Sequence, residues 1–509
     1  MNSSNKRILK NSFALYIHMF IVMGVTLFTS RVVLKALGVE DFGIYNVVGG
    51  IVFFFAFMNG AMSRTTQRFV ALELGKGDKG DVVSVFSSCV TVHLLIALVV
   101  FVLAETLGLY VLNHMLVIPE NRIQAAFWVY QFSILSCIVM IISTPYNGAI
   151  VAHEKMMAFA YIAIIDAILR LIVAYAIIYD YSDRLVVYSG LLFLVQVITR
   201  LYYNYYCHFF LPHLKFKLIL DYRKLKDVMV FSGWTLFDNF SIISCSQGIN
   251  IVLNMFFSPA VNAARSIAGQ VENAVKSFSM NFQTSTYPQI TKSYSSGEMD
   301  RLYSLLFATS KYSFFLLLLV SFPIFIETKT ILQLWLGIPP TYSVAFVRVS
   351  LVVSLINVFA DPLAIVVGAM GKIKYFQMYS GIAFVSILPI SFVLFLFYKD
   401  PILIFYVYLL ISIIVLIFKL TYIHRELGLP IYSYCLSVII PSIRVTIISV
   451  LFFYLLKLHF GLPNILELFS HVIFYIFFLL IVVLFVGISK SERNFIKGYL
   501  RRKINAGKD

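Results

Sequence analysis

The sequence has little charge. Charged residues make up 13% of its 509 residues, whereas 60% are hydrophobic and the mean hydropathy is +0.89. A soluble protein of this size could not hide so much apolar surface from water. The chain also contains many apolar runs of about 20 residues, the length a helix needs to cross a bilayer. The composition therefore excludes an ordinary soluble protein and indicates a membrane protein.

Cysteines and long polar loops are also scarce. The five cysteines stand singly within apolar stretches, with neither a metal-ligand spacing nor a disulfide framework. They are typical of small core residues, so no metal or other cofactor is expected. No loop is long enough for a soluble catalytic domain, and any chemistry must therefore take place inside the membrane.

The apolar runs predict an all-α polytopic protein with about fourteen transmembrane helices, in two six-helix lobes plus two C-terminal helices. The expected spans lie near 12–37, 42–63, 84–104, 123–143, 157–179, 186–210, 229–256, 261–287, 303–326, 343–368, 376–398, 402–422, 436–456 and 466–488. The expected domains are a first lobe at 1–210, a basic linker at 211–227, a second lobe at 228–400 (to about 423 with its last helix), additional helices at 424–489 and a basic tail at 490–509.

An internal repeat organises the chain. Residues Arg31–Val52 recur 219 positions later as Asn250–Val271, with matching Val-Leu, Gly and Val positions and no gap. A second set of residues recurs at an offset of 217 positions: Pro145, Ala152 and Lys155 match Pro362, Ala369 and Lys372. An even number of spans per repeat predicts two halves related by a pseudo-twofold axis along the membrane normal, with a cavity between them.

The positive charges predict the orientation. The net charge is +16, and the cations gather between the apolar runs, which fits membrane orientation better than nucleic-acid binding. With the N-terminus in the cytoplasm, inward segments hold about 24 cations and outward segments about 5. Both termini and the linker are therefore expected in the cytoplasm.

The eighth span carries the most informative polar residues. Arg265, Glu272, Lys276 and Gln283 are spaced by 7, 4 and 7, which places them on one helix face together with Gly269. Glu272 and Lys276 can pair, which leaves Arg265 as the unpaired cation. Polar groups inside spans are costly, so each is a candidate for function.

The other leading spans also offer polar, mainly cationic faces, the arrangement expected around a cavity for an anionic ligand. The candidate substrate-binding residues are Arg265, Arg31, Arg64, Lys35, Lys276, Asn250 and Asn46. The candidate sites for a coupling proton or sodium ion are Glu272, Asp238 and Asp166.

Several of these residues also have a structural interpretation. Arg64 and Arg68 are also placed as interfacial anchors at a helix end, and Arg31 and Lys35 are close enough to the outer end to snorkel. These alternatives stay open at the level of sequence.

Two further groups are ambiguous in the same way. Asp166 and Arg170, at i and i+4, also fit an internal ion pair that locks two helices. The Asp361-Pro362 pair is typical of a helix kink or end.

The chain resembles a known family. The segment GVEDFGIYNVVGGIV after a basic N-terminal span, STPYNGAIVAHEKM at Ser143–Met156 and the fourteen-span layout resemble polysaccharide flippases of the Wzx type. These belong to the multidrug/oligosaccharidyl-lipid/polysaccharide (MOP) exporter superfamily. The resemblance covers the whole chain and is strongest over residues 10–160.

The resemblance implies a multi-pass protein of the bacterial inner membrane whose two lobes form a V that opens to one side at a time. The implied substrate is undecaprenyl pyrophosphate carrying a few sugars of an O-antigen, capsule or exopolysaccharide repeat unit, and polysaccharide polymerase machinery is a candidate partner. Lipid II flippases of the superfamily use arginines of the first, second and eighth spans, whose counterparts by span are Arg31, Arg64 and Arg265.

Two other functions remain possible from the sequence. An antiporter for drugs or organic cations, like the MATE transporters, would share the fold but should have a cavity dominated by carboxylates. A membrane polymerase or ligase would need a large outward loop, whereas the outward stretches Glu105–Arg122 and Glu327–Tyr342 are short. We therefore expect a transporter rather than an enzyme.

Overall fold

The structure is a computed structural model. It describes residues 3–114, 118–179, 183–211, 214, 216–217, 221–257, 259–336, 338–457, 465–489 and 492–494. Within the helices some side chains fall outside this description, including those of Arg31 and Asn46.

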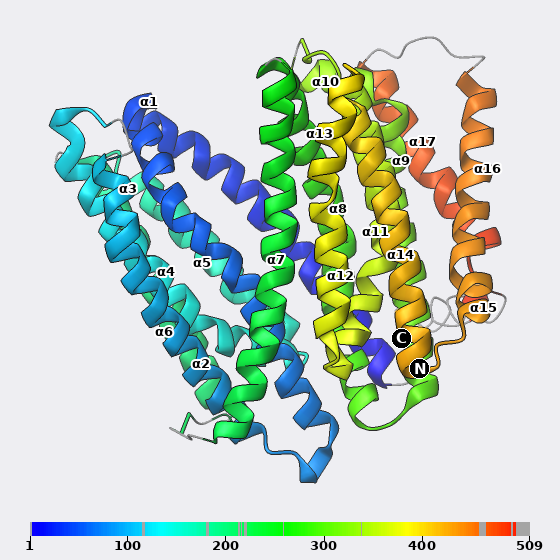
Figure 1. Cartoon of the computed structure of the whole chain (residues 1–509), viewed down its shortest axis with the longest axis horizontal. Coiled ribbons are helices and arrows are strands. Elements are labelled where there is room, and N and C mark those ends of the chain that lie inside the picture. The colour runs from blue at the N-terminus through cyan, green and yellow to red at the C-terminus, as the bar shows by residue number, and fades with distance from the viewer. Residues whose placement is uncertain are drawn as a thin grey trace, which may run out of the picture. The chain divides into compact units, whose positions relative to one another are not determined.

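All regular secondary structure in these residues is helical, which confirms the predicted fold class (Figure 1). The longer helices are α1 (Ser3–Gly75), α2 (Val82–Leu103), α4 (Ile123–Ala152), α5 (Met156–Ala176), α6 (Arg184–Phe210), α7 (Tyr222–Phe256), α8 (Pro259–Ser295), α9 (Met299–Ile326), α11 (Ser343–Met370), α12 (Ile373–Val385), α13 (Ile387–Phe397), α14 (Leu403–Leu427), α16 (Ile440–Lys457) and α17 (Ile465–Val482). The shorter ones are η1 (Gly77–Lys79), η2 (Ala104–Gly108), α3 (Leu109–His114), η3 (Glu120–Arg122), α10 (Thr328–Leu336), α15 (Ile431–Tyr434), η4 (Cys435–Ile439) and η5 (Val483–Gly487).

The expected spans map onto these helices. Eleven helical segments of the described residues are long and apolar enough to cross a membrane. The first two expected spans both fall within α1, and the eighth is α8, whose polar residues keep it outside that set. The short helix α10, in the stretch after Glu327, was not predicted.

The first copy of the repeat bends at Gly38. Its φ of 79° lies in the left-handed region that glycine adopts without a Cβ penalty, and it breaks α1 into two segments. The position 219 residues later is Phe257, which lies between the end of α7 and the start of α8. Both copies therefore join two helices through a break at the same point.

The second repeated segment, with its offset of 217 positions, also corresponds to a structural feature that occurs twice. Pro145 lies inside α4 and Pro362 inside α11, so Pro362 does not end its helix as one interpretation of the sequence suggested. After each helix comes a residue with positive φ, Glu154 at 62° and Gly371 at 78°, and the next helix starts two residues further on. These turn residues are 217 positions apart, which supports an internal duplication.

The chain forms two compact units that do not follow chain order. The first unit comprises Met1–Phe240, Thr284–Met299 and Gly368–Met378. The second comprises Ser241–Gln283, Asp300–Val367 and Tyr379–Asp509. The unit boundaries thus fall inside α7, α8, α9, α11 and α12, and they differ from the lobe boundaries expected from sequence. Those lobe boundaries stay a prediction.

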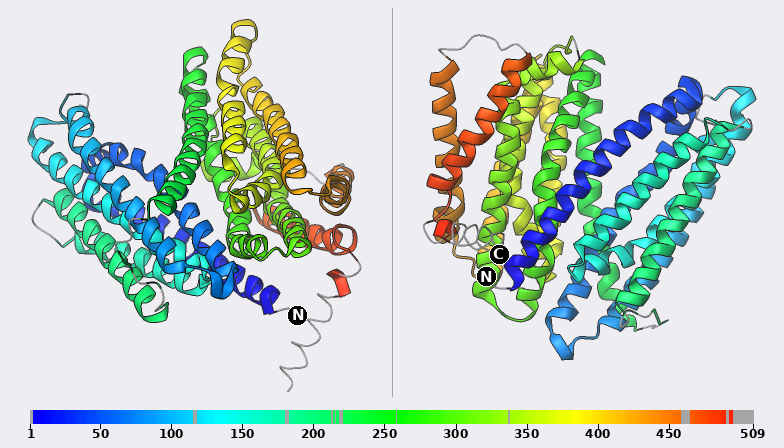
Figure 2. Two further views of the ribbon diagram at one scale, coloured as in Figure 1. Left: turned by 60° about the horizontal axis from the view of Figure 1, so that its bottom comes forward. Right: turned by 180° about the vertical axis from the view of Figure 1, so that it is seen from behind.

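In the first unit α4 is the central helix. It packs along α1, α2 and α6, which lie side by side in Figures 1 and 2. The fully buried Tyr130 of α4 donates a hydrogen bond of 2.7 Å to the Ala104 carbonyl of η2. An apolar core that includes Ile134 and Ile141 surrounds this contact.

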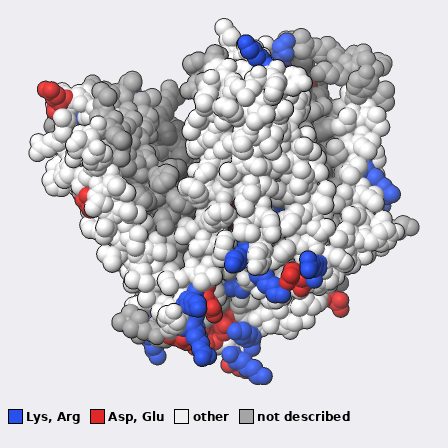
Figure 3. All heavy atoms as spheres, viewed as in Figure 1, with Lys and Arg blue, Asp and Glu red and all other residues white. Residues whose placement is uncertain are grey.

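The second unit is packed largely by aromatic rings. Phe346 of α11 and Phe405 of α14 lie with ring centroids 4.4 Å apart, and Phe314 of α9 stacks on Phe359 of α11 at 4.7 Å. On the face shown in Figure 3, most charged side chains lie toward one end of the helices and a few toward the other, and the surface between these ends is nearly uncharged. A broad uncharged band is the surface that a bilayer requires.

The last described residues, 492–494, are joined to α9 by an ion pair with the buried Lys311. Lys311 Nζ lies 2.6 and 2.8 Å from the two carboxylate oxygens of Glu492, and the Tyr312 hydroxyl donates to the same carboxylate at 3.0 Å. Burial alone would raise the pKa of Glu492, but the hydrogen bonds from Lys311 and Ser489 outweigh it and lower that pKa. The Lys311 side chain is only 9% exposed, and Glu492 is the carboxylate that pairs with it.

We therefore expect Glu492→Gln to destabilise the protein by about 2–3 kcal/mol at neutral pH, because it strands a buried cation. A carboxyl whose folded pKa is lowered contributes stability above its unfolded value, near 4.3, and loses it as pH falls through the folded pKa. Thermal unfolding in detergent should show a gap between the two proteins at pH 7 that narrows as the pH falls below about 4. Glu120→Gln, at an exposed carboxylate, should produce no such gap; an equal gap in both variants would contradict the prediction.

Candidate functional site

The polar face predicted on the eighth span forms inside the second unit. Arg265 and Glu272 of α8 are buried, at 8% and 7% exposure. Lys276 Nζ lies 2.6 Å from Glu272 Oε1, so the expected i, i+4 ion pair is present. Gln283, at the end of the same stripe, is also buried.

The Arg265 guanidinium lies back over its own helix. A Cβ placed on Gly269 would come within 3.0 Å of Arg265 Nη1, so the glycine leaves room for the arginine. The guanidinium carbon lies 5.6 Å from the centroid of Phe405, at the edge of cation–π range. The arginine at i therefore packs over the glycine at i+4, where a larger residue would leave it no space.

Three residues from other helices complete the site. Tyr408 of α14 lies within electrostatic range of Arg265, Glu272 and Lys276. Cys245 of α7 is buried and lies within electrostatic range of Arg265 and Tyr408. Asp361 of α11 is exposed and lies within electrostatic range of Lys276.

The cluster contains two cations, Arg265 and Lys276, and two carboxylates, Glu272 and Asp361, but the opposite charges are not evenly distributed. Both carboxylates, Glu272 and Asp361, are near Lys276. Arg265 instead has an aromatic ring and a thiol as neighbours, and its buried Nε has no hydrogen-bond partner among the described residues. A buried guanidinium nitrogen without an acceptor is costly, so this end of the cluster favours a ligand that brings anionic oxygens.

In the first unit Arg64 has a partner from α7. Its exposed guanidinium donates from Nη2 to Asn239 Oδ1 at 2.5 Å, and Asp238 is the half-buried residue beside that asparagine. Lys35 is exposed on α1. Because an exposed Arg64 fits both a ligand contact and an interfacial anchor, both roles stay predictions.

Arg68, one turn further along α1, is bound tightly instead. It is buried, and it donates from Nε to the Gly368 carbonyl and from Nη2 to the Ala369 carbonyl at 3.4 Å. Its guanidinium also lies 4.6 Å and 4.5 Å from the ring centroids of Phe69 and Phe231. Arg68 therefore holds the end of α11 rather than offering a free charge.

Glu154 anchors a second segment of the first unit. Its carboxylate is buried and accepts from Gln289 Nε2 at 2.6 Å and from Lys292 Nζ at 2.7 Å, both on α8. These contacts hold a non-glycine residue in the left-handed region, which costs of order 1–3 kcal/mol.

Three candidate residues remain: Asn250, Arg31 and Asn46. Asn250 of α7 is half-buried, and its Nδ2 donates to Gln247 Oε1 of the same helix at 3.3 Å. The side chains of Arg31 and Asn46 lie outside the described residues. Their assignment to the site stays a prediction.

A polar cavity of about 170 Å³ lies between α4, α5 and α6 of the first unit. Arg170 Nε donates to Asp166 Oδ2 at 2.7 Å, and Thr199 Oγ1 donates to Asp166 Oδ1 at 3.1 Å. Arg170 also reaches Gln196 Oε1 at 3.3 Å from Nη2. The pair joins two helices, as the structural interpretation requires, and it also lines a space large enough for water.

If Asp166 and Arg170 form a structural pair, Asp166→Ala should lower the amount of folded protein because it removes the counter-charge of Arg170. The double variant Asp166→Ala/Arg170→Ala should recover part of that loss. Size-exclusion chromatography of solubilised membranes would measure both. Normal folding of Asp166→Ala with loss of ion-dependent transport would instead assign Asp166 to coupling.

Sequence comparison gives no relative for this chain: no protein-family model matches it, and no curated protein matches it either. Solved structures do match. One is a MATE protein in the straight conformation, with a TM-score of 0.71, 14% identity, and coverage of 83% of this chain and 96% of that one. A second is a multidrug resistance MATE family transporter of the MOP superfamily in an outward-facing conformation, with a TM-score of 0.73, 12% identity, and coverage of 84% and 96%.

A third match is a MOP superfamily transporter from Pyrococcus furiosus, described as having a reverse polarity of the binding pocket that suggests a different function. Its TM-score is 0.69 at 14% identity, with coverage of 82% of this chain and 96% of that one. At these identities the comparisons show the fold and no more. The protein has the fold of the MATE transporters.

With the fold assigned, the sequence prediction divides into two parts. The all-helical, multi-span MATE-like architecture is shown. The narrower Wzx-type branch, and with it the nature of the substrate, remains a proposal.

Proposed function

We propose that the protein is a transporter that moves an anionic lipid-linked oligosaccharide, of the undecaprenyl-pyrophosphate type, across the bacterial inner membrane by alternating access. The observation that carries the proposal is the buried Arg265, whose Nε has no hydrogen-bond partner in the part of the chain that the structure describes. A guanidinium fork suits the oxygens of a diphosphate better than an ammonium does. Tyr408, within electrostatic range of Arg265, carries a hydroxyl that can donate a further hydrogen bond.

The fold supports transport without covalent chemistry. The two stretches expected on the outer side, which a polymerase or ligase would use, are short, and they contain η2 from Glu105 on, α3, η3 and α10. An enzymatic role is therefore the weaker alternative. Glu272, Asp238 and Asp166 remain the proposed positions for a coupling proton or sodium ion.

A second candidate is a MATE-like antiporter for drugs or organic cations. The fold comparisons favour it more directly, because a matching structure is described as a multidrug resistance transporter. The exposed Asp361 near Lys276 is the kind of group that an organic cation would need. The two candidates differ in the sign of the substrate's charge, and Arg265 favours the anionic one.

A strain that lacks the protein tests the proposal. We expect it to lose its surface polysaccharide and to accumulate lipid-linked oligosaccharide in the inner membrane, which thin-layer chromatography of extracted lipids would measure. Unchanged glycan together with increased sensitivity to organic cations such as ethidium would favour the antiporter instead.

A further inference from the structure

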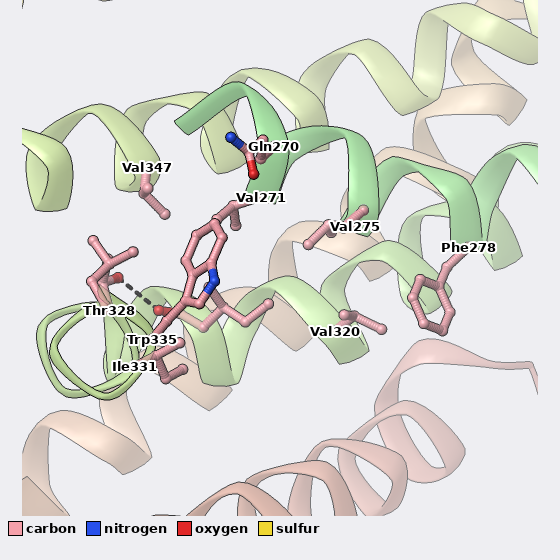
Figure 4. A pocket seen from close by; sticks show the side chains of 12 residues that line it. Gln270, Val271, Val275, Phe278, Val320, Thr328, Ile331, Trp335 and Val347 are labelled. Carbon is pink, nitrogen blue, oxygen red and sulfur yellow. Dashed lines mark hydrogen bonds between the residues drawn. The ribbon is translucent and has the colours of Figure 1, made fainter. Parts of the chain in front are cut away.

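Helix α8 is shared between the two compact units. Its part up to Gln283 belongs to the second unit, where Val271 and Val275 line an apolar cavity with side chains of α9, α10 and α11 (Figure 4). The segment Thr284–Met299, which contains the end of α8, belongs to the first unit. So does Gly368–Met378, which contains the turn between α11 and α12. Two segments of the second repeat, the half of the chain after the linker, are therefore packed with the first repeat.

The end of α8 holds the turn between α4 and α5. Glu154 in that turn accepts hydrogen bonds from Gln289 Nε2 at 2.6 Å and from Lys292 Nζ at 2.7 Å. The Glu154 side chain is only 4% exposed, so this ion pair is largely shielded from water. The second repeat is thus bound to a turn of the first.

The end of α1 holds the corresponding turn of the second repeat. Arg68 donates to the carbonyls of Gly368 and of the residue after it. Gly371 in this turn is the counterpart of Glu154 at the offset of 217, and both have positive φ. Arg68 in turn corresponds to Tyr287 of α8 at the offset of 219. Each repeat therefore uses the end of its second span to bind the same turn of the other repeat, as expected around a twofold axis.

The two helix ends also contact each other. Ser295 Oγ of α8 donates to the Leu72 carbonyl of α1 at 2.6 Å. A Cβ on Gly75 would lie 2.7 Å from Ser295 Cβ, so the glycine permits this close approach. The contacts between the repeats named here are hydrogen bonds and an ion pair, and each of them can be exchanged for hydrogen bonds to water.

Pro288 gives α8 a point at which to bend. It lies inside the helix, where a proline has no N–H to donate to the carbonyl four residues earlier. That carbonyl belongs to Thr284, the residue at which the first unit's share of α8 begins. One helical hydrogen bond is therefore missing where α8 passes from one unit to the other, and a missing bond of this kind permits a kink.

We propose that these reciprocal contacts form a gate that closes one end of the transport pathway and releases once in every transport cycle. On release, the end of α8 and the α11–α12 turn leave α1 and α4, and α8 bends at Pro288. The proposal rests on the proposed function in one respect, since it requires alternation between two conformations, but it does not depend on the sign of the substrate's charge. The positive charges of the sequence predict that this end faces the cytoplasm.

A disulfide across the gate tests whether it must open. Gly75→Cys/Ser295→Cys joins the two helix ends where their Cβ positions are close. Thr66→Cys/Gly148→Cys joins α1 and α4 within the first repeat, where a Cβ on Gly148 would lie 2.9 Å from Thr66 Cβ, and serves as the matched control. Both double variants carry Cys89→Ala, because Thr66 lies beside that buried thiol.

The measurement is translocation by the purified full-length protein in liposomes, before and after reduction of the disulfide. The probes are a fluorescent undecaprenyl-diphosphate oligosaccharide and ethidium. The oxidised gate variant should transport neither probe, and reduction should restore the transport that the wild-type protein shows. The control pair should transport equally in both states.

The outcomes separate the gate from the proposed function. Equal rates for the oxidised and reduced gate variant would overturn the gate and leave the proposed function in place. Transport of ethidium alone, stopped by the disulfide, would contradict the proposed substrate and support the gate. Transport of neither probe by the wild-type protein would contradict the proposed function, and the gate would then be decided by a measurement that needs neither transport nor the disulfide.

That second measurement is the distance between spin labels attached at Lys155→Cys and Ser296→Cys, two exposed positions on the α4–α5 turn and after the end of α8. Double electron–electron resonance should show a shorter and a longer separation. Lys292→Ala removes the positive charge beside the buried Glu154 carboxylate, so it should raise the ratio of the longer to the shorter separation at least about tenfold. Lys79→Ala, at an exposed lysine of the same unit outside the gate, should leave the ratio unchanged. One identical separation in all three proteins would overturn the gate.

Discussion

Replacing Arg265 with alanine should stop transport of the lipid-linked oligosaccharide without loss of membrane-inserted protein. Truncating one member of a buried, hydrogen-bonded charge pair costs about 2–5 kcal/mol, which corresponds to at least about a thirtyfold loss in substrate affinity. Folding should survive, because the guanidinium Nε has no hydrogen-bond partner among the described residues and Glu272 on the same face keeps its ion pair with Lys276.

The lysine variant separates charge from geometry. Arg265→Lys keeps the positive charge but loses the bidentate fork, so it should restore transport only in part. Arg444→Ala, at an exposed arginine of α16 in the same unit, should transport normally. Full export by Arg265→Ala at normal expression would remove Arg265 from the site, as would an experimental structure with its side chain among lipid headgroups.

The largest effect on folding is expected at Gly371. Its φ of 78° disfavours any residue with a Cβ, and a Cβ at this position would collide with the guanidinium of the buried Arg68. Arg68 cannot easily move, since it is held by two carbonyls of α11 and two aromatic rings. Gly371→Ala should therefore destabilise the protein by about 2–4 kcal/mol, the sum of backbone strain and overpacking.

Gly297 provides the matched control. Its φ is 76°, but a Cβ there would meet nothing within 4 Å, so Gly297→Ala should cost only the backbone term of about 1 kcal/mol. In a thermal-stability assay on solubilised protein, Gly371→Ala should unfold at a clearly lower temperature than Gly297→Ala. Because Arg68 supplies the collision, Arg68→Ala/Gly371→Ala should lose less than the sum of the two single changes. Equal midpoints for the two glycine variants would show that the Arg68 contact is absent.

Much of the architecture was predictable because membrane helices follow local rules. Apolar runs located the helices, and the spacing of Glu272 and Lys276 predicted their ion pair, since both depend only on residues within a few turns. The repeat of Arg31–Val52 also anticipated a break at Gly38 and at the matching position after α7.

What could not be predicted depends on contacts between distant segments. Tyr408 and Phe405 carry no signal in the sequence that places them beside Arg265, because an aromatic residue in an apolar run is usually lipid-facing or core. Asp361 gave only the signal of a proline-associated kink, although it lies near Lys276. Nor could spacing show that Glu154 has a positive φ, because charged residues seldom adopt it without tertiary partners such as Lys292.

The sign of the substrate's charge is the most direct test. Purified protein in liposomes would be given a fluorescent undecaprenyl-diphosphate oligosaccharide in one experiment and ethidium in another, with the rate of translocation measured for each. If Arg265 recognises an anionic diphosphate, the lipid-linked oligosaccharide crosses, its transport falls at least about thirtyfold in Arg265→Ala, and ethidium moves no faster than in protein-free liposomes. Transport of ethidium that is unaffected by Arg265→Ala, with no translocation of the lipid-linked oligosaccharide, would contradict it.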